Sequence, residues 1–304
     1  MKQLSYNFFM IKKLFLLCLL ILLFSFCKKE EELWPWPEPP APVIADYPCW
    51  TPDGSKIAYC RDQQIWIVDT LGNTWNMFEG SSFGAVLPHF SPDGKWLVFV
   101  SRGHIYKARV REDWRIDTSS ITKLTDFARN FFPKWSPNGD LIAYNSNAHD
   151  TSNLLYSIWL MKVDGSEKRM IPNGDGMMPS WSPSGKRIVY DAGGGQIVII
   201  SIDGSQRKLL TIGEGPASWA PFDTLIAFRK DSLVGKRGKP FIYLIDTSGA
   251  RFIRLTSGMQ PTWSPDGKKI AFCDLCSEGE RYTEYWTLYI IDIESKKRKQ
   301  LIFK

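Results

Sequence analysis

Short apolar runs alternate with polar turns along most of the chain, from Tyr47 to the C-terminal residues. Runs of this length, bounded by Pro, Gly, Asp and Ser, are typical of β-strands. They come in groups of four. The first run ends on an aromatic residue, and a turn similar to Ser-Pro-Asp-Gly leads into the second run. The group is completed by a third run such as QIVIIS (196–201) and a short fourth run such as RKLL (207–210). The pattern predicts an all-β chain of four-stranded antiparallel sheets.

The group recurs six times with a constant internal spacing. An aromatic residue ends the first run of every unit, at Trp50, Phe90, Trp135, Trp181, Trp219 and Trp263. A second aromatic residue follows each of these after nine positions, at Tyr59, Phe99, Tyr144, Tyr190, Phe228 and Phe272. Six four-stranded units of roughly 40 residues each predict a six-bladed β-propeller.

The turn between the first two runs explains why their register is constant. Proline presets φ for the first corner of a type I turn, and the glycine that follows takes the left-handed conformation that leads into the next strand. The fifth unit has Asp223 in place of this glycine, and Asp tolerates positive φ better than most residues. Because the aromatic residues recur in every unit, we expect them to pack between neighbouring sheets, not to form a binding stripe.

The repeat resembles that of the TolB-type propellers of bacterial envelopes. The motif is clearest in PTWSPDGKKIAF (261–272), with a later run of the form IW or IY before a DG turn, and the resemblance covers residues 48–303. It implies a propeller domain over residues 47–304. TolB proteins carry in addition an N-terminal α/β domain, for which we expect no counterpart here. Membership of the Tol machinery therefore does not follow from the resemblance.

The N-terminal residues have a different character. Two lysines precede an uncharged run from Leu14 to Phe26, which is too short to span a membrane and is typical of a secretory signal. Residues 1–27 resemble a bacterial lipoprotein signal, in which Cys27 becomes the lipidated first residue, although Phe26 is larger than the residue usual before that cysteine. An ordinary secretory signal or an uncleaved anchor are the alternatives. We expect a signal over residues 1–26 and a Pro-rich tether over residues 27–46.

The lipoprotein resemblance implies a location in the cell envelope. The protein would sit on the outer membrane and face either the periplasm or the cell surface. Removal of residues 1–26 takes away three lysines and no acid, which lowers the net charge from +6 to +3. Without a concentrated basic stripe, nucleic acid is not an expected partner.

Features that differ between the units are the best candidates for function. Three units have long loops between their second and third runs: 145–153, 229–239 and 274–285. All such loops emerge on one face of a propeller, and loops of this length are commonly functional. The fifth unit's loop is basic and the sixth unit's is acidic, so the two could pair or present a split surface. The predicted partner-binding residues are Asn147, His149, Asp150, Arg229, Lys230, Lys236, Arg237, Lys239, Glu278, Glu280, Arg281 and Glu284.

Two further groups of side chains are candidates for local chemistry. His89 and Lys134 precede the first aromatic residue of their units and should lie near the central channel, as ordinary solvated polar groups or as ligand contacts. Cys49, Cys60, Cys273 and Cys276 allow three disulfide connectivities. In an exported protein, the pairs Cys49–Cys60 and Cys273–Cys276 are preferred. A zinc site is a weaker alternative because the spacing is irregular.

No catalytic constellation is evident. The chain has no GxSxG motif, and its three histidines, His89, His104 and His149, lie in the second and third units. The sequence therefore favours a non-catalytic, monomeric propeller without cofactor or metal, which binds another envelope protein and is held at the membrane by its lipid. The alternative is a glycan-binding or glycan-cleaving propeller that uses the channel mouth, as oligosaccharide lyases on related propellers do. That function would require the histidines to converge on one face with carboxylates nearby.

Overall fold

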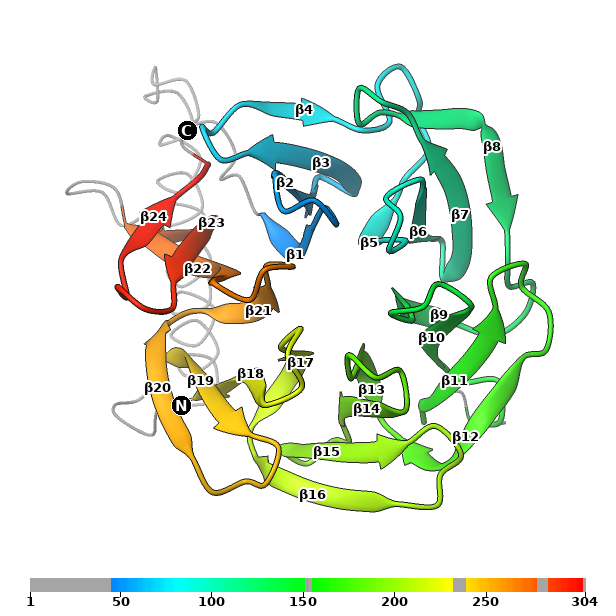
Figure 1. The fold of residues 1–304 in the computed structure, drawn as a ribbon. Helices are drawn as coiled ribbons and strands as arrows, with labels where there is room; N and C mark the ends of the chain where they lie inside the picture. The colour runs from blue at the N-terminus through cyan, green and yellow to red at the C-terminus, as the bar shows by residue number, and fades with distance from the viewer. Residues whose placement is uncertain (1–44, 151, 153–154, 232–238, 278–283, 303–304) are drawn as a thin grey trace, which may run out of the picture. The chain divides into compact units, whose positions relative to one another are not determined.

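In the computed structural model, residues 45–150, 152, 155–231, 239–277 and 284–302 are described, and they form six four-stranded antiparallel sheets. The sheets stand around a central axis as the blades of a propeller (Figure 1). Each blade uses four consecutive strands, and no α-helix occurs among the described residues. The predicted six-bladed propeller is therefore confirmed. The blades lie within the unit that spans residues 42–304.

The strands occupy four equivalent positions, from the axis outward. The innermost strands are β1 (Asp46–Trp50), β5 (Val86–Phe90), β9 (Asn130–Trp135), β13 (Met177–Trp181), β17 (Glu214–Trp219) and β21 (Met259–Trp263). The second strands are β2 (Lys56–Arg61), β6 (Trp96–Ser101), β10 (Leu141–Ser146), β14 (Arg187–Asp191), β18 (Leu225–Asp231) and β22 (Lys269–Ser277). The third strands are β3 (Gln64–Asp69), β7 (His104–Val110), β11 (Ser157–Lys162), β15 (Gln196–Ser201), β19 (Pro240–Asp246) and β23 (Glu284–Asp292). The outermost strands are β4 (Thr74–Asn76), β8 (Ile116–Lys123), β12 (Arg169–Asp175), β16 (Arg207–Ile212), β20 (Phe252–Ser257) and β24 (Arg298–Gln300).

The strand directions define two faces of the propeller. Every innermost strand begins on the face that carries the connections between second and third strands, which we call the loop face. The opposite face carries the Ser-Pro turns, and we call it the turn face. In the sixth blade the Gly267 N–H donates to the Ser264 carbonyl over 2.9 Å, and Gly267 has a φ of 67°. Asp223 takes the corresponding position in the fifth blade with a φ of 57°, as predicted.

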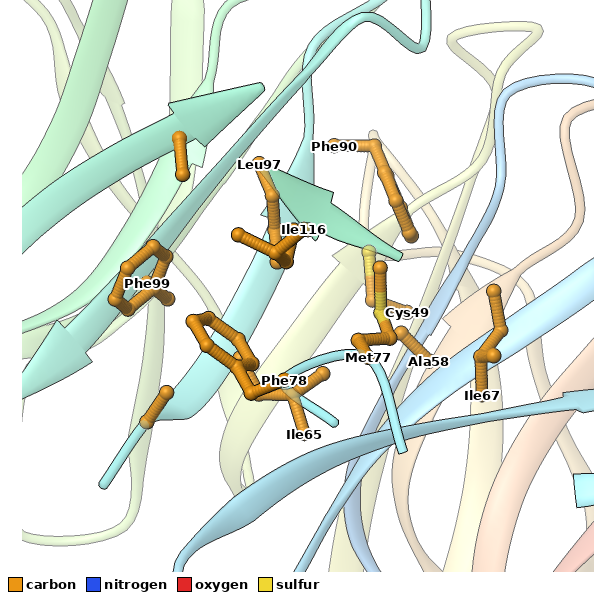
Figure 2. Close-up of a cluster of buried hydrophobic side chains, with 12 residues drawn as sticks. Cys49, Ala58, Ile65, Ile67, Met77, Phe78, Phe90, Leu97, Phe99 and Ile116 are labelled. Atoms are coloured by element: carbon orange, nitrogen blue, oxygen red, sulfur yellow. The ribbon is translucent and has the colours of Figure 1, made fainter. Parts of the chain in front are cut away.

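The hydrophobic core is divided among the blade interfaces. Six clusters of buried side chains are found in the described residues, one between each pair of neighbouring blades. Figure 2 shows the cluster between the first two blades, which includes Ile65 and Ile67 of β3 and Leu97 and Phe99 of β6. All twelve repeated aromatic residues are at most 7% exposed. The prediction that they pack between sheets is confirmed.

The ring closes by packing and not by a shared strand, because β24 pairs with β23 of its own blade. Between the sixth and first blades, Leu301 and Ile302 pack in one cluster with Trp50 and Tyr59. The Trp50 indole N–H also donates to the Thr262 carbonyl over 3.1 Å. No helix among the described residues is long and apolar enough to cross a membrane. The predicted signal, Cys27 and almost all of the predicted tether lie outside the described residues.

Candidate functional site

The innermost strands surround a cavity of about 480 Å³ on the propeller axis. The residue that precedes the repeated aromatic lines this cavity in all six blades: Cys49, His89, Lys134, Ser180, Ser218 and Thr262. The structure therefore places both predicted channel residues, His89 and Lys134, in the wall of one cavity. Proline and tryptophan side chains supply much of the remaining wall.

A second ring of side chains lines the cavity nearer the loop face. It consists of the residues before the first proline in five blades, Tyr47, Leu87, Phe132, Met178 and Gln260, and all have a φ between 52° and 59°. The strand register is irregular at this point in every blade. Left-handed backbone at a non-glycine residue costs of the order of 1–3 kcal/mol. The Tyr47 and Phe132 rings, from the first and third blades, lie 5.3 Å apart in an edge-on contact, so large side chains narrow this end of the channel.

Hydrogen bonds between neighbouring blades give the polar cavity residues a structural role. The backbone N–H of Trp135 donates to Nδ1 of His89 over 3.2 Å. In the same way, the Trp219 N–H donates to Ser180 Oγ over 3.1 Å, and the Trp263 N–H donates to Ser218 Oγ over 3.4 Å. Each of these side chains thus accepts a hydrogen bond from the next blade. This role could not be predicted from the sequence, because donor and acceptor are about 40 residues apart.

Burial lowers the pKa of both basic cavity residues. Desolvation, together with the neighbouring Lys134, lowers the pKa of His89 well below its usual value. Desolvation also lowers the pKa of Lys134. His89 is therefore a neutral imidazole at physiological pH, and since its Nδ1 accepts a hydrogen bond, its proton is on Nε2.

The predicted disulfide pairing is wrong, because Cys49, Cys60 and Cys273 are buried free thiols. Strand pairing sets Cys49 opposite Ala58 and Cys60 opposite Asp46, so the two cysteines are diagonal neighbours. Such neighbours have Cα atoms about 7–8 Å apart, whereas the Cα atoms of a disulfide are usually about 4.4–6.8 Å apart.

The thiols instead make contacts with neighbouring segments. Cys60 Sγ accepts a hydrogen bond from the Leu87 N–H over 3.1 Å, and Cys273 Sγ donates to the Ala45 carbonyl over 3.0 Å. Cys49 lies in the apolar cluster of Figure 2. The side chain of Cys276 lies outside the described residues.

The third blade's loop is the best described of the three long loops. Asn147 is 1% exposed, and its Oδ1 accepts a hydrogen bond from the Arg129 N–H over 2.8 Å. It therefore holds the loop in place and cannot contact a partner directly. His149 is exposed, and Asp150 accepts hydrogen bonds from the backbone of Ser152 and Leu155. These two residues lie on the loop face.

The fifth blade's predicted loop is shorter than expected, because β18 continues to Asp231 and β19 begins at Pro240. Arg229 is inside β18, where its guanidinium pairs with Asp231 over 2.8 Å and with Glu214 over 3.0 Å. Lys230 lies over the Phe252 ring at 5.4 Å, and Lys239 is exposed. Lys236 and Arg237 lie outside the described residues.

The sixth blade's predicted loop also includes strand residues, because β22 extends to Ser277 and β23 begins at Glu284. Asp274 is 3% exposed and pairs with Arg298 over 2.9 Å. The side chain of Glu284 is outside the described residues, as are Glu278, Glu280 and Arg281. The predicted pairing between the two charged loops therefore stays a prediction.

The three histidines do not form one ligand set. His89 lines the cavity, His104 begins β7, and His149 lies in the third blade's loop, where its Nε2 is 3.2 Å from Ser157 Oγ. Ser157 Oγ in turn donates to Asp175 over 2.6 Å. This is not the order of a catalytic triad, in which the carboxylate orients the histidine. Among the described residues, no group of three or more His, Cys, Asp or Glu side chains is arranged to hold a metal ion.

Exposed apolar side chains mark part of the loop face. Phe127 is 58% exposed in the connection before β9, and Leu155 is 65% exposed in the connection before β11. Met177 begins β13 and is 36% exposed, and Ile212 ends β16 and is 54% exposed. All four therefore lie at the loop-face end of their strands, between the second and fifth blades. The sequence could not show this, because apolar residues of the same types are buried elsewhere in the repeat.

Comparison with known proteins supports the repeat type. Residues 41–184 match the family model described as the PD40 TolB beta propeller domain. The chain is 35% identical over 130 residues to an uncharacterized protein of Agrobacterium fabrum, which corresponds to 38% of this chain and 42% of that protein. The chain thus spans less than half the length of this curated relative.

Three solved structures share the fold. A candidate TolB from Agrobacterium tumefaciens has a TM-score of 0.62 at 19% identity, with 74% of this chain and 87% of that chain covered. TolB from Acinetobacter baumannii has a TM-score of 0.60 at 19% identity, with 73% of this chain but only 57% of that chain covered. An oligogalacturonate lyase in complex with manganese has a TM-score of 0.56 at 13% identity, covering 86% of this chain and 78% of the lyase. At these identities the likeness concerns the fold alone.

Proposed function

We propose that this six-bladed propeller, whose repeats are of the TolB type, is a non-catalytic binding platform that contacts another protein of the bacterial cell envelope through its loop face. The observation that carries the proposal is the set of exposed apolar side chains at one end of the strands. Exposed apolar groups rimmed by polar residues commonly mark interaction sites.

The loop face combines the features that protein interfaces use. Phe127 and Leu155 offer large apolar contacts, and aromatic residues are enriched at interface centres. His149 and Lys239 are exposed on the same face and can supply polar contacts at its rim. The turn face also has exposed apolar residues, including Leu71 at 80% exposure, but its turns are short and repeat between blades. The loop face is where the blades differ, so it is the better surface for a specific partner.

The N-terminal residues support a location at the membrane. In this proposal Cys27 is lipidated, residues 27–46 act as a tether, and a monomeric propeller is held close to the outer membrane on its periplasmic or external side. A single lipid chain gives only weak membrane binding, so stable attachment requires more than one acyl chain.

Glycan cleavage is the less favoured function. A metal-assisted lyase mechanism needs converging histidine and carboxylate ligands, and the described histidines occupy three separate places. The likeness to the lyase concerns the fold at 13% identity, and it carries no catalytic residue over to this chain.

Site-specific photo-crosslinking in intact cells tests the proposal. A benzophenone amino acid replaces Leu155 on the loop face or Leu71 on the turn face, two exposed leucines that serve as a matched pair. We expect a discrete crosslinked species from the Leu155 position and none from the Leu71 position. Equal crosslinking from both positions, or none from Leu155, would contradict a loop-face platform.

A further inference from the structure

Several polar side chains in the cavity wall present hydrogen-bond donors to the cavity, because their acceptor atoms already bind backbone N–H groups of the next blade. The Nδ1 atom of His89 accepts the Trp135 N–H, so the neutral ring presents Nε2–H as its remaining polar group. Ser180 Oγ and Ser218 Oγ each accept a backbone N–H from the next blade, which leaves their hydroxyl hydrogens for donation. A ligand in this cavity therefore meets donors on three blades.

Lys134 differs from the equivalent residues of the other blades because its side chain is a basic amine. Its equivalents in the other blades are Cys, His, Ser, Ser and Thr, all of which can accept a hydrogen bond. An ammonium group has three donors and no acceptor. Among the described residues that line the cavity, Lys134 is also the only Lys or Arg, and none is Asp or Glu. No carboxylate in this wall therefore pairs with the Lys134 ammonium group.

The surroundings of Lys134 favour an anion with an apolar body. A cation withdrawn from water regains its lost solvation most effectively from a hydrogen-bonded anion. Much of the wall is Trp and Pro, and Phe132 and Met178 narrow the loop-face end. A volume of about 480 Å³ is within the range of small-molecule sites. A bulky polyanion would be poorly matched, because a single cation faces it.

We propose that the central cavity binds a small organic monocarboxylate, with its carboxylate on Lys134 Nζ and its apolar body against the ring that includes Phe132 and Met178. His89 Nε2–H, on the neighbouring blade, supplies a further donor to the carboxylate oxygens. This site lies on the axis and is independent of the partner-binding loop face proposed above.

Calorimetric titration of the full-length chain with benzoate tests the site. Benzamide and benzylammonium have the same ring with a neutral or a positive group, and inorganic phosphate is an anion without an apolar body. We expect benzoate to bind and the other three not to bind at the same concentrations. Lys134→Met should weaken benzoate binding about 10- to 100-fold, which corresponds to the loss of one charge-assisted hydrogen bond. Lys134→Arg should retain most of the affinity.

Two control variants separate the site from general effects. Lys95→Met removes an exposed lysine of the second blade outside the cavity wall and should leave benzoate binding unchanged. Met178→Phe copies the residue that the third blade has at the same position, Phe132, with a similar φ, and should reduce binding by filling the cavity. The second variant keeps the test valid even if Lys134→Met fails to fold. The proposal is overturned if benzamide or phosphate binds as well as benzoate, or if benzoate at about 10 mM gives no more heat than dilution into buffer. It is also overturned if Lys134→Met or Met178→Phe binds benzoate with unchanged affinity.

Discussion

The repeated aromatic residues should carry a large part of the stability, and Phe272→Ala measures it. Phe272 is 0% exposed in β22 and packs in the cluster between the fifth and sixth blades. Its ring lies 5.7 Å from the Tyr289 ring in a stacked contact, and the Arg298 guanidinium lies 5.4 Å from its centroid. Truncation to Ala removes all of these contacts and leaves a cavity where two blades meet.

The expected loss follows from the complete burial of the ring. Transfer of the buried apolar surface to water accounts for about 1.5–3 kcal/mol. The cavity that remains raises the usual cost of Phe→Ala to about 3–5 kcal/mol. The middle of this range is about 4 kcal/mol, which corresponds to a fall in Tm of about 8–16 °C for a domain of this size.

Urea denaturation followed by tryptophan fluorescence gives the free energy of unfolding for this comparison. The matched control is Phe127→Ala, the same substitution at a side chain that is 58% exposed, and it should change the free energy of unfolding by about 0.5 kcal/mol or less. A loss below about 1 kcal/mol for Phe272→Ala, or equal losses for the two variants, would refute the argument that the repeated aromatics form the core between blades.

Four further predictions concern other parts of the structure. Ser218→Ala removes the acceptor of the Trp263 N–H and should lower the free energy of unfolding by about 1–3 kcal/mol in the same assay; an unchanged value would show that the bond between blades adds nothing. Hydrogen bonds from the Ser91 hydroxyl and the Lys95 N–H lower the pKa of Asp93 in the folded protein. The ionised Asp93 carboxylate therefore stabilises the fold above the unfolded-state pKa of about 3.9, and this stabilisation is lost as the pH falls through the lower folded-state pKa. Urea midpoints measured from pH 6 to pH 2 should thus fall less steeply for Asp93→Asn than for the native chain, and identical profiles would contradict this cause. Burial raises the pKa of Cys60 to about 12, so a thiol reagent such as Ellman's reagent at pH 8 should modify Cys60 only after unfolding; rapid native reaction, or a mass showing a disulfide, would contradict the structure. Cys27→Ala should abolish incorporation of radiolabelled palmitate and release the protein from the membrane fraction, and continued labelling would exclude lipidation at this cysteine.

Much of the fold could be predicted because it is encoded locally and six times over. The Ser-Pro turn, the glycine or Asp223 after it, and the nine-residue interval to the next aromatic are all contained within about a dozen consecutive residues. A short segment of this kind sets the register of a hairpin through backbone geometry and side-chain alternation. The number of units then specified the number of blades, and the observed sheets agree with it.

The functional features depend on contacts between residues far apart in the chain. Whether Cys60 meets another cysteine or the Leu87 N–H was decided by the packing of the first blade against the second. Whether Arg229 is available to a partner was decided by Glu214 and Asp231. The donor character of the cavity appears only when neighbouring blades pack together, because His89, Ser180 and Ser218 each accept a hydrogen bond from the following blade. Local sequence determines the blade, which is the repeated unit. The wall of the channel and the exposed apolar groups of the loop face instead combine residues from several blades. Only the tertiary structure brings these residues together, because they are far apart in the chain.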